Sequence, residues 1–352
     1  MKKIYENFSV KNLDKSRVEI SASLPAEQFD ACRTEALKNI GESVTIDGFR
    51  KGKIPENVLV QKVGEKTILE EMAEIALGKT YPDIIVNEKI DAIGRPEIRI
   101  TKLAAGNPLE FSIITAIVPV VTLPDYKSIA ESVEKAPTDE KVTDAEIDEA
   151  ILRIRKSHAS HEGHDHDKMT AEEHEKAIMD ALPELTDDFV KTLGDFADIT
   201  DFKSKLSIMI AEDKKNQARE KRRIAIADAL LEKTLLELPD VMIQSEVNRT
   251  EAQFKADIER MGIKLDDYLN HAKKSIEDLR VDWKPAAEKK AKLQLILNAI
   301  AENEKLNPSR EEIATEADHI IEHYADADRE RAEIYAETVL TNEKVFQFLE
   351  KA

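Results

Sequence analysis

Hydrophobic and polar residues change their period twice in the first third of the chain. Apolar and polar residues alternate over 18–24, which predicts a half-buried β-strand. Apolar residues then recur at helical spacing over 25–41, 55–64 and 65–88, and prolines or glycines stand at the ends of these stretches. The pattern therefore predicts one strand followed by three helices.

Alternation returns after the third helix and predicts a β-hairpin. Ile98 and Ile100 alternate with polar residues, and a second alternating run covers 109–113. The Ala-Ala-Gly-Asn-Pro sequence at 104–108 between them is typical of a turn. Residues 1–116 are thus expected to form a small α+β domain, in which helices pack on a small antiparallel sheet.

The rest of the chain is expected to be mostly α-helical. Prolines at 119, 124 and 137 predict an extended connector over 117–142. A helix should follow over 143–156, because Thr143 and Glu146 have the spacing of a capping box. From residue 182 to 352, helical periodicity predicts an extended helical domain with helices at 199–237 and 239–262, one that starts at Pro285, one capped by Ser309 and Glu312, and a last one that ends near Leu349.

Composition and charge narrow the possible functions. The chain has 52 Lys and Arg against 71 Asp and Glu, a net charge of −19. Residues 1–115 hold 17 basic against 18 acidic residues, so the remainder carries −18. Such a chain should be repelled by bulk nucleic acid and anionic lipid, and any contact with RNA needs a local basic tip.

Candidate chemistry of other kinds is sparse. One cysteine excludes an internal disulfide framework, and no apolar stretch follows the first lysines or is long enough to span a membrane. We therefore expect a cytoplasmic protein. No phosphate-binding loop, metalloprotease motif or nucleophile elbow occurs, so neither catalysis nor a cofactor is expected.

The sequence Gly-Phe-Arg-Lys-Gly-Lys-Ile-Pro at 48–55 has the properties of an exposed loop tip. Two glycines enclose Phe49, Arg50 and Lys51, and Lys53 comes just before a proline that starts a helix. The cations could contact phosphates while the phenylalanine enters a pocket or stacks. The alternative is a solvated turn with incidental lysines.

This sequence resembles the signature loop of the trigger factor family, chaperones that dock beside the ribosomal tunnel exit. The Pro-Glu-Ile-Arg-Ile strand (96–100), the run Leu-Pro-Glu-Leu-Thr-Asp-Asp-Phe-Val-Lys (182–191) and the Asn-Glu-Lys-Leu run (303–306) are also similar to trigger factor segments. The resemblance implies a ribosome-binding domain at 1–116 and a chaperone domain at 143–156 and 182–352. It also implies that the docking loop comprises Gly48, Phe49, Arg50, Lys51, Gly52, Lys53 and Pro55.

The expected function is then an ATP-independent chaperone, active in protein folding and export, that shields nascent polypeptides on the large ribosomal subunit. The expected partners are protein and rRNA at the tunnel exit, unfolded chains, and a second copy of the chain away from the ribosome. The alternative is a ribosome-independent dimeric holdase or assembly scaffold, for which the loop would be irrelevant.

The segment 157–181 departs from the family pattern. Most family members carry a prolyl-isomerase barrel at this place, but here 25 residues contain five histidines, many acids and no Phe, Tyr or Trp. So short a segment is not expected to form that barrel, and no isomerase activity is predicted. Its histidines could bind zinc or nickel, but the lack of a recognised ligand framework favours a polar replacement segment. The metal-ligand candidates are His158, His161, His164 and His166.

Overall fold

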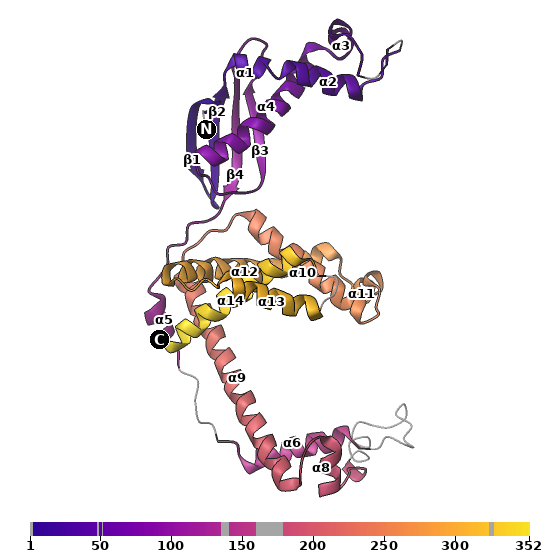
Figure 1. Cartoon of the computed structure of the whole chain (residues 1–352), viewed down its shortest axis with the longest axis vertical. Coiled ribbons are helices and arrows are strands. Elements are labelled where there is room, and N and C mark those ends of the chain that lie inside the picture. Colours follow the sequence, from indigo (N-terminus) through magenta and orange to yellow (C-terminus); the bar gives the residue numbers. More distant parts are fainter. Residues whose placement is uncertain (1–2, 48, 51, 135–140, 160–178, 324–326) are drawn as a thin grey trace. The chain divides into compact units, whose positions relative to one another are not determined.

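The computed structural model describes residues 3–47, 49–50, 52–134, 141–159, 179–323 and 327–352. The chain divides into two compact units (Figure 1). The first comprises residues 1–124 and 231–345, and the second comprises residues 125–230 and 346–352.

A four-stranded antiparallel sheet organises the start of the first unit. Its strand order is β1 (Glu6–Leu13), β2 (Arg17–Leu24), β4 (Leu109–Ile117) and β3 (Ala92–Lys102). Ile20 lies opposite Ile113, and Ala22 lies opposite Phe111, so their side chains share one face. The helix α4 (Glu65–Asn87) covers that face (Figure 1) and completes a core of 20 buried side chains.

Three shorter helices complete this α+β region, which we define as residues 3–117. They are α1 (Ala26–Asp30), α2 (Arg33–Ser43) and α3 (Glu56–Val63). The single helix predicted over 25–41 is wrong, because the chain turns between α1 and α2, where the Cys32 amide donates to the Phe29 carbonyl (3.0 Å). The turn allows Phe29 and Ala36, both fully buried, to reach one core.

The other predictions for this region agree with the structure, except for one strand. The predicted strand at 18–24 is β2, the helices at 55–64 and 65–88 are α3 and α4, and the hairpin is β3–β4. β1 was not predicted. Most of its side chains are exposed, so no clear alternation marks it in the sequence.

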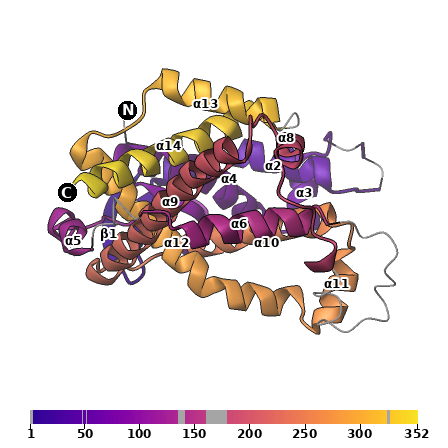
Figure 2. The same cartoon turned by 90° about the horizontal axis from the view of Figure 1, so that it is seen from below.

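The helical region, which we define as residues 240–345 of the first unit, consists of antiparallel helix pairs. It contains α10 (Asp240–Arg260), α11 (Leu265–Ala272), α12 (Ile276–Glu304), α13 (Arg310–His323) and most of α14 (Arg329–Lys351). α10 packs on α12 through a cluster that includes Ile243, Val247, Ala287 and Ala291. α13 packs on α14 through three buried alanines (Figures 1 and 2).

The prediction that a helix starts at Pro285 is wrong. α12 begins at Ile276, where Ser275 and Asp278 form a capping box, and Pro285 lies inside the helix. Proline lacks an N–H group, so the carbonyl of Val281 has no partner one turn ahead. The predicted cap at the start of α13 is confirmed, since the Glu312 amide donates to Ser309 Oγ (3.2 Å) and the Ser309 amide donates to Glu312 Oε2 (2.7 Å).

The second unit contains α5 (Tyr126–Ser132), α6 (Asp144–Ser157), α8 (Asp187–Leu193) and most of α9 (Ile199–Lys233). The predicted capping box of Thr143 and Glu146 is confirmed. α5 interrupts the connector that was expected to be extended, because Asp125 caps it and Tyr126 and Ala130 are buried. No helix in the described parts of the chain is long and apolar enough to cross a membrane.

Candidate functional site

The loop at 48–55 leaves the end of α2 and returns at the start of α3. Its base is closed by a hydrogen bond from the Gly52 amide to the Gly41 carbonyl (2.8 Å). Two turns shape its tip, in which the Phe49 amide donates to Ile46 O (3.1 Å) and the Lys53 amide donates to Arg50 O (3.0 Å). Gly52 has a φ of +71°, a conformation that favours glycine.

The described side chains of this loop face solvent at the tip and pack inward at the base. Phe49 is 41% exposed, and Arg50 and Lys53 are also exposed. Ile54 is half-buried against the core of the α+β region. Gly48 and Lys51 lie outside the described residues. The described part of the loop therefore presents one aromatic ring and two cations on an anchored base.

Arg33 connects the three helices that carry the loop. Its guanidinium, at the start of α2, donates to Glu56 Oε1 on α3 (2.9 Å) and to both carboxylate oxygens of Glu65 on α4 (2.6 and 3.1 Å). These hydrogen bonds raise the pKa of Arg33 and lower the pKa of Glu65. Arg33 was not predicted as part of the site, because its partners lie 23 and 32 residues away and no local motif marks them.

A second feature is the apolar surface of the helices. In the helical region the exposed apolar side chains are Val241, Met261, Ile263, Val281, Ile334, Tyr335 and Val339. In the second unit, Ile208, Met209 and Ile224 are exposed along α9. Exposed apolar groups on separate helices can contact unfolded chains without a shaped pocket.

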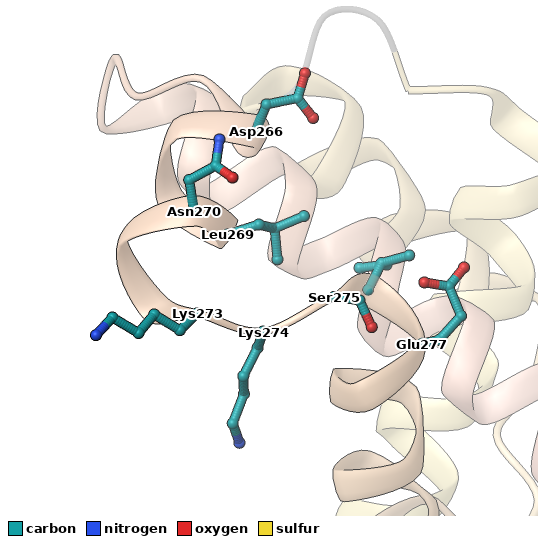
Figure 3. Close-up of a pocket in the computed structure, with 8 residues that line it drawn as sticks. Asp266, Leu269, Asn270, Lys273, Lys274, Ser275 and Glu277 are labelled. Atoms are coloured by element: carbon teal, nitrogen blue, oxygen red, sulfur yellow. The ribbon is translucent and has the colours of Figure 1, made fainter.

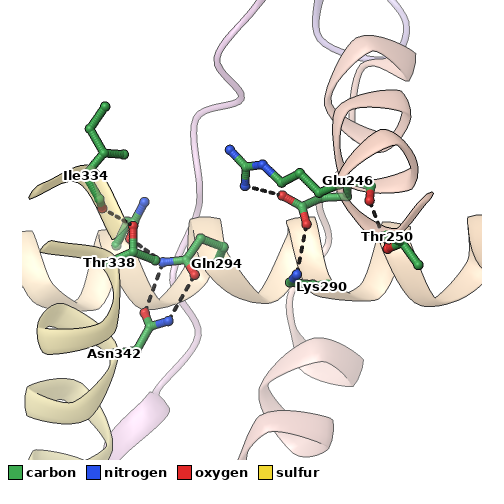
Figure 4. A network of polar contacts seen from close by, with 9 residues as sticks. Glu246, Thr250, Lys290, Gln294, Ile334, Thr338 and Asn342 are labelled. Carbon is green, nitrogen blue, oxygen red and sulfur yellow. Dashed lines mark hydrogen bonds and ion pairs between the residues drawn. The ribbon is translucent and has the colours of Figure 1, made fainter. Parts of the chain in front are cut away.

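Polar contacts also join α10, α12 and α14 (Figure 4). Glu246 of α10 pairs with Lys290 of α12 (3.2 Å). Gln294 of α12 exchanges two hydrogen bonds with Asn342 of α14, both 3.0 Å long. These contacts link the three helices in addition to the apolar cluster between α10 and α12.

A shallow hollow lies between α11 and α12, with a volume of about 750 Å³. Leu269 and Ile276 supply its apolar wall, while Lys273 and Lys274 extend away from the helices (Figure 3). Lys274 is paired with Asp282 (2.5 Å). Acidic and basic groups both border the hollow, so it has no clear preference for a charged ligand.

Of the four candidate metal ligands, His158 is the one that lies among the described residues. His158 follows α6 as its C-cap, and its ring nitrogen lies 3.1 Å from the Ile154 carbonyl oxygen. His161, His164 and His166 lie outside the described residues. Among the residues that the structure describes, no group of three or more His, Cys, Asp or Glu side chains is placed to hold a metal ion.

Comparison with known families decides the identity of the chain. The family model of the bacterial trigger factor protein matches residues 6–154, and the model of the trigger factor C-terminus matches residues 198–350. The chain belongs to the trigger factor family. Trigger factors are chaperones, and the predicted family is thereby confirmed.

Individual trigger factors agree over most of their length. The Streptomyces coelicolor trigger factor is 26% identical, over 87% of this chain and 79% of its own. The Carboxydothermus hydrogenoformans protein is 24% identical over 92% of each chain, and the Desulforamulus reducens protein is 25% identical over 97% and 96%.

A solved trigger factor structure shares the fold. It comes from a study of promiscuous substrate recognition in the folding and assembly activities of that chaperone. The TM-score is 0.58 at 20% identity, with 97% of this chain and 99% of that chain covered. The predicted fold class, an α+β part followed by a mostly helical part, is confirmed.

Proposed function

We propose that this trigger factor docks at the ribosomal tunnel exit through the loop at 48–55 and shields emerging polypeptides with its helices. In this proposal residues 1–116 form the ribosome-binding domain and residues 143–156 and 182–352 form the chaperone domain. The connector spans 117–142 and the replacement segment spans 157–181. The protein acts in the cytoplasm and needs no cofactor.

The observation that carries the docking proposal is the contrast between the tip and the base of the loop. The base is held by the Gly52–Gly41 hydrogen bond, and the Arg33 contacts join the helices on either side of the loop, so both ends of the loop are anchored. The tip leaves Phe49, Arg50 and Lys53 free for a pocket and for phosphates. Lys51 is proposed as a third contact, and Gly48 and Pro55 as residues that shape the loop.

The exposed apolar groups of the helices support the shielding role. They are spread over several helices, so they favour weak and reversible contacts with many different clients. Attachment to the ribosome would raise the effective concentration of such a weak binder beside its client. The −18 charge of residues 116–352 would oppose adhesion to rRNA and leave docking to the loop.

Salt dependence tests the docking mechanism. If the two or three cations of the loop contact phosphates, ribosome affinity should fall with salt concentration, with a slope of roughly 2–3 on logarithmic axes. Co-sedimentation with 70S ribosomes over a range of potassium chloride concentrations measures this slope. An affinity independent of salt would contradict the phosphate contacts.

A ribosome-independent dimeric holdase or assembly scaffold is the second candidate function. The same exposed apolar groups support it, because they need no ribosome to bind an unfolded chain. In that case substitutions in the loop at 48–55 would leave activity unchanged. Activity here means suppression of aggregation, measured by light scattering of a denatured client.

We also propose that the chain has no prolyl-isomerase activity. The segment 157–181 lies between the two family matches and has no Phe, Tyr or Trp to line a pocket for a twisted amide. Protease-coupled isomerisation of an X-Pro model peptide should run at the uncatalysed rate at any concentration of the chain. Acceleration in proportion to protein concentration would contradict this.

A further inference from the structure

The apolar face of the sheet, which α4 covers, continues onto the outer strand β3, where its side chains are partly exposed. Ile98 lies opposite Ile113, and Ile100 lies opposite Phe111 on β4. The two β4 side chains are 0% and 2% exposed, whereas Ile98 and Ile100 are 44% and 38% exposed. The apolar rows of the core thus continue onto an edge strand that no further strand covers among the described residues.

The edge of β3 is usable over a short stretch only. Its pairing with β4 is regular over residues 97–100, and the register shifts between Ile93 and Glu97 and again between Ile100 and Lys102. Pro96, just before this stretch, lacks an N–H group. Such interruptions are common protections against unlimited strand pairing. Here they leave a window of four residues for a partner strand.

The charge at this edge is opposite to that of the rest of the molecule. Arg95, Arg99 and Lys102 stand on β3 beside one acid of the same strand, Glu97, and all four are exposed. Lys102 pairs with Glu110 of β4 (3.5 Å), so Arg95 and Arg99 supply the positive charge of the edge. In the part of the chain that the structure describes, Arg99 has no ion-pair partner. Residues 116–352 carry −18, so an acidic segment repelled by the helices would be attracted here.

We propose that residues 97–100 of β3 capture an extended client segment as a fifth strand of the sheet. The segment would place apolar side chains beside Ile98 and Ile100 and acidic side chains on the opposite face, next to Arg99. Main-chain hydrogen bonds supply affinity without regard to sequence, and the alternating side chains supply the preference. The inference rests on the proposed chaperone function and adds a class of client, acidic and alternating, that the acidic helices disfavour.

The register of the window favours a client over a second copy of the chain. Directly opposed residues of antiparallel strands point to the same face. Two copies that join their isoleucine rows must therefore pair Ile98, Arg99 or Ile100 with itself. Pairing Ile98 or Ile100 with itself uses at most three residues of the window, and pairing Arg99 with itself opposes two cations. A client segment has neither restriction and can use all four residues.

Backbone methylation tests strand addition on the full chain. The probe is a fluorescein-labelled nine-residue peptide of alternating valine and glutamate, in three forms: unmethylated, N-methylated at the valines and N-methylated at the glutamates. Successive residues direct their N–H groups to opposite edges of a strand, so one methylated form alone should lose affinity, by at least about tenfold. Equal anisotropy titrations of the two methylated forms would overturn the proposal.

Substitutions locate the site. Ile98→Lys with Ile100→Lys should abolish binding of the peptide, whereas Val10→Lys on the opposite edge strand should not, although Val10 is also 44% exposed on the same face. Arg99→Glu should reverse the preference between the glutamate peptide and its lysine counterpart. Binding that survives the double substitution, or that Val10→Lys also removes, would place the contact elsewhere and refute the proposal.

Two controls separate this inference from the other proposals. Co-sedimentation with ribosomes should be the same for the double variant and the wild type, so a loss of docking would be a distinct failure. In sedimentation velocity of the chain alone, the wild type and the double variant should show the same degree of self-association. Self-association that the double variant removes would assign the edge to a second copy and overturn the client proposal.

Discussion

α4 in the α+β region and α10 in the helical region have similar lengths but are buried very differently. α4 buries seven side chains along 23 residues, whereas α10 buries three along 21, and the eight-residue α11 buries none. α4 lies against a sheet, and α10 packs chiefly on one helix. The continuous core of the α+β region supports Ile54 at the base of the loop. The small cluster between α10 and α12 leaves apolar side chains exposed to other chains.

The largest expected difference between the two regions is the cost of removing a core isoleucine. Ile113→Ala in the sheet should lower the free energy of unfolding by about 4 kcal/mol, because Ile113 is fully enclosed and its neighbours cannot fill the cavity. Ile243→Ala in α10 should cost about 2 kcal/mol, since the small cluster around it can collapse. Hydrogen exchange in urea, resolved by peptide, measures both. Equal losses of unfolding free energy in the two variants would contradict the difference between the two regions.

The next largest effect concerns the hydrogen bonds of Arg33 that join α2, α3 and α4 beside the loop. Arg33→Met should lower stability by about 1–2 kcal/mol, because Glu65 and Glu56 lose hydrogen bonds from a charged donor. Arg33→Lys should restore little of it, since lysine cannot bind both oxygens of Glu65 in the same fork. Urea denaturation measures stability, and co-sedimentation measures docking. Full recovery of stability with lysine would show that a positive charge, rather than the two-pronged guanidinium contact, joins the three helices.

Two glycines of the α+β region should respond in opposite directions. Gly52→Ala should cost about 1 kcal/mol, because φ at Gly52 is +71°. Gly78→Ala, inside α4 with nothing within 4 Å of the added carbon, should stabilise by about 0.4–1 kcal/mol. Thermal denaturation of the two variants checks the signs. A neutral Gly52→Ala would mean that the base of the loop is not fixed in this conformation.

The smallest effect is a pH dependence of the helical region. Hydrogen bonds from Lys344 and from the backbone amide and hydroxyl of Ser309 lower the pKa of Glu312 from 4.5 to about 2. The stabilisation is therefore complete above pH 4.5 and is lost as the pH falls towards 2. Glu312→Gln should be less stable than the wild type at pH 7, and the two should converge near pH 2. Parallel stability curves over this range would exclude the carboxylate as the cause.

Elements with local signals could be predicted from the sequence. α3 and α4 start beside Pro55 and Gly64, and α6 and α13 have capping boxes, so their starts are set by nearby residues. β1 is mostly exposed, and the break before α2 depends on packing of Phe29 and Ala36, so neither has a local pattern. The predicted start of α12 was wrong because Pro285 also has the local signal of a helix start, whereas the cap formed by Ser275 and Asp278 lies earlier in the chain.

The candidate site shows the same division. The glycines and cations of 48–55 are contiguous in sequence and could be recognised directly. The contacts that hold the loop, from Arg33 to Glu65 and from Gly52 to Gly41, join separate elements and follow from the fold. The positions of Ile98 and Ile100 at an uncovered edge also follow from the strand order, since their alternation alone predicts burial on one face.

The most direct test of docking through the loop is co-sedimentation with 70S ribosomes of a variant with Phe49, Arg50 and Lys51 all changed to alanine. A matched control changes Val86, Lys62 and Lys66, an exposed apolar residue and two exposed lysines of the same region, to alanine. We expect the loop variant to stay in the supernatant, while the control and the wild type pellet with ribosomes. Equal sedimentation of the loop variant and the wild type would contradict the account and favour the ribosome-independent holdase.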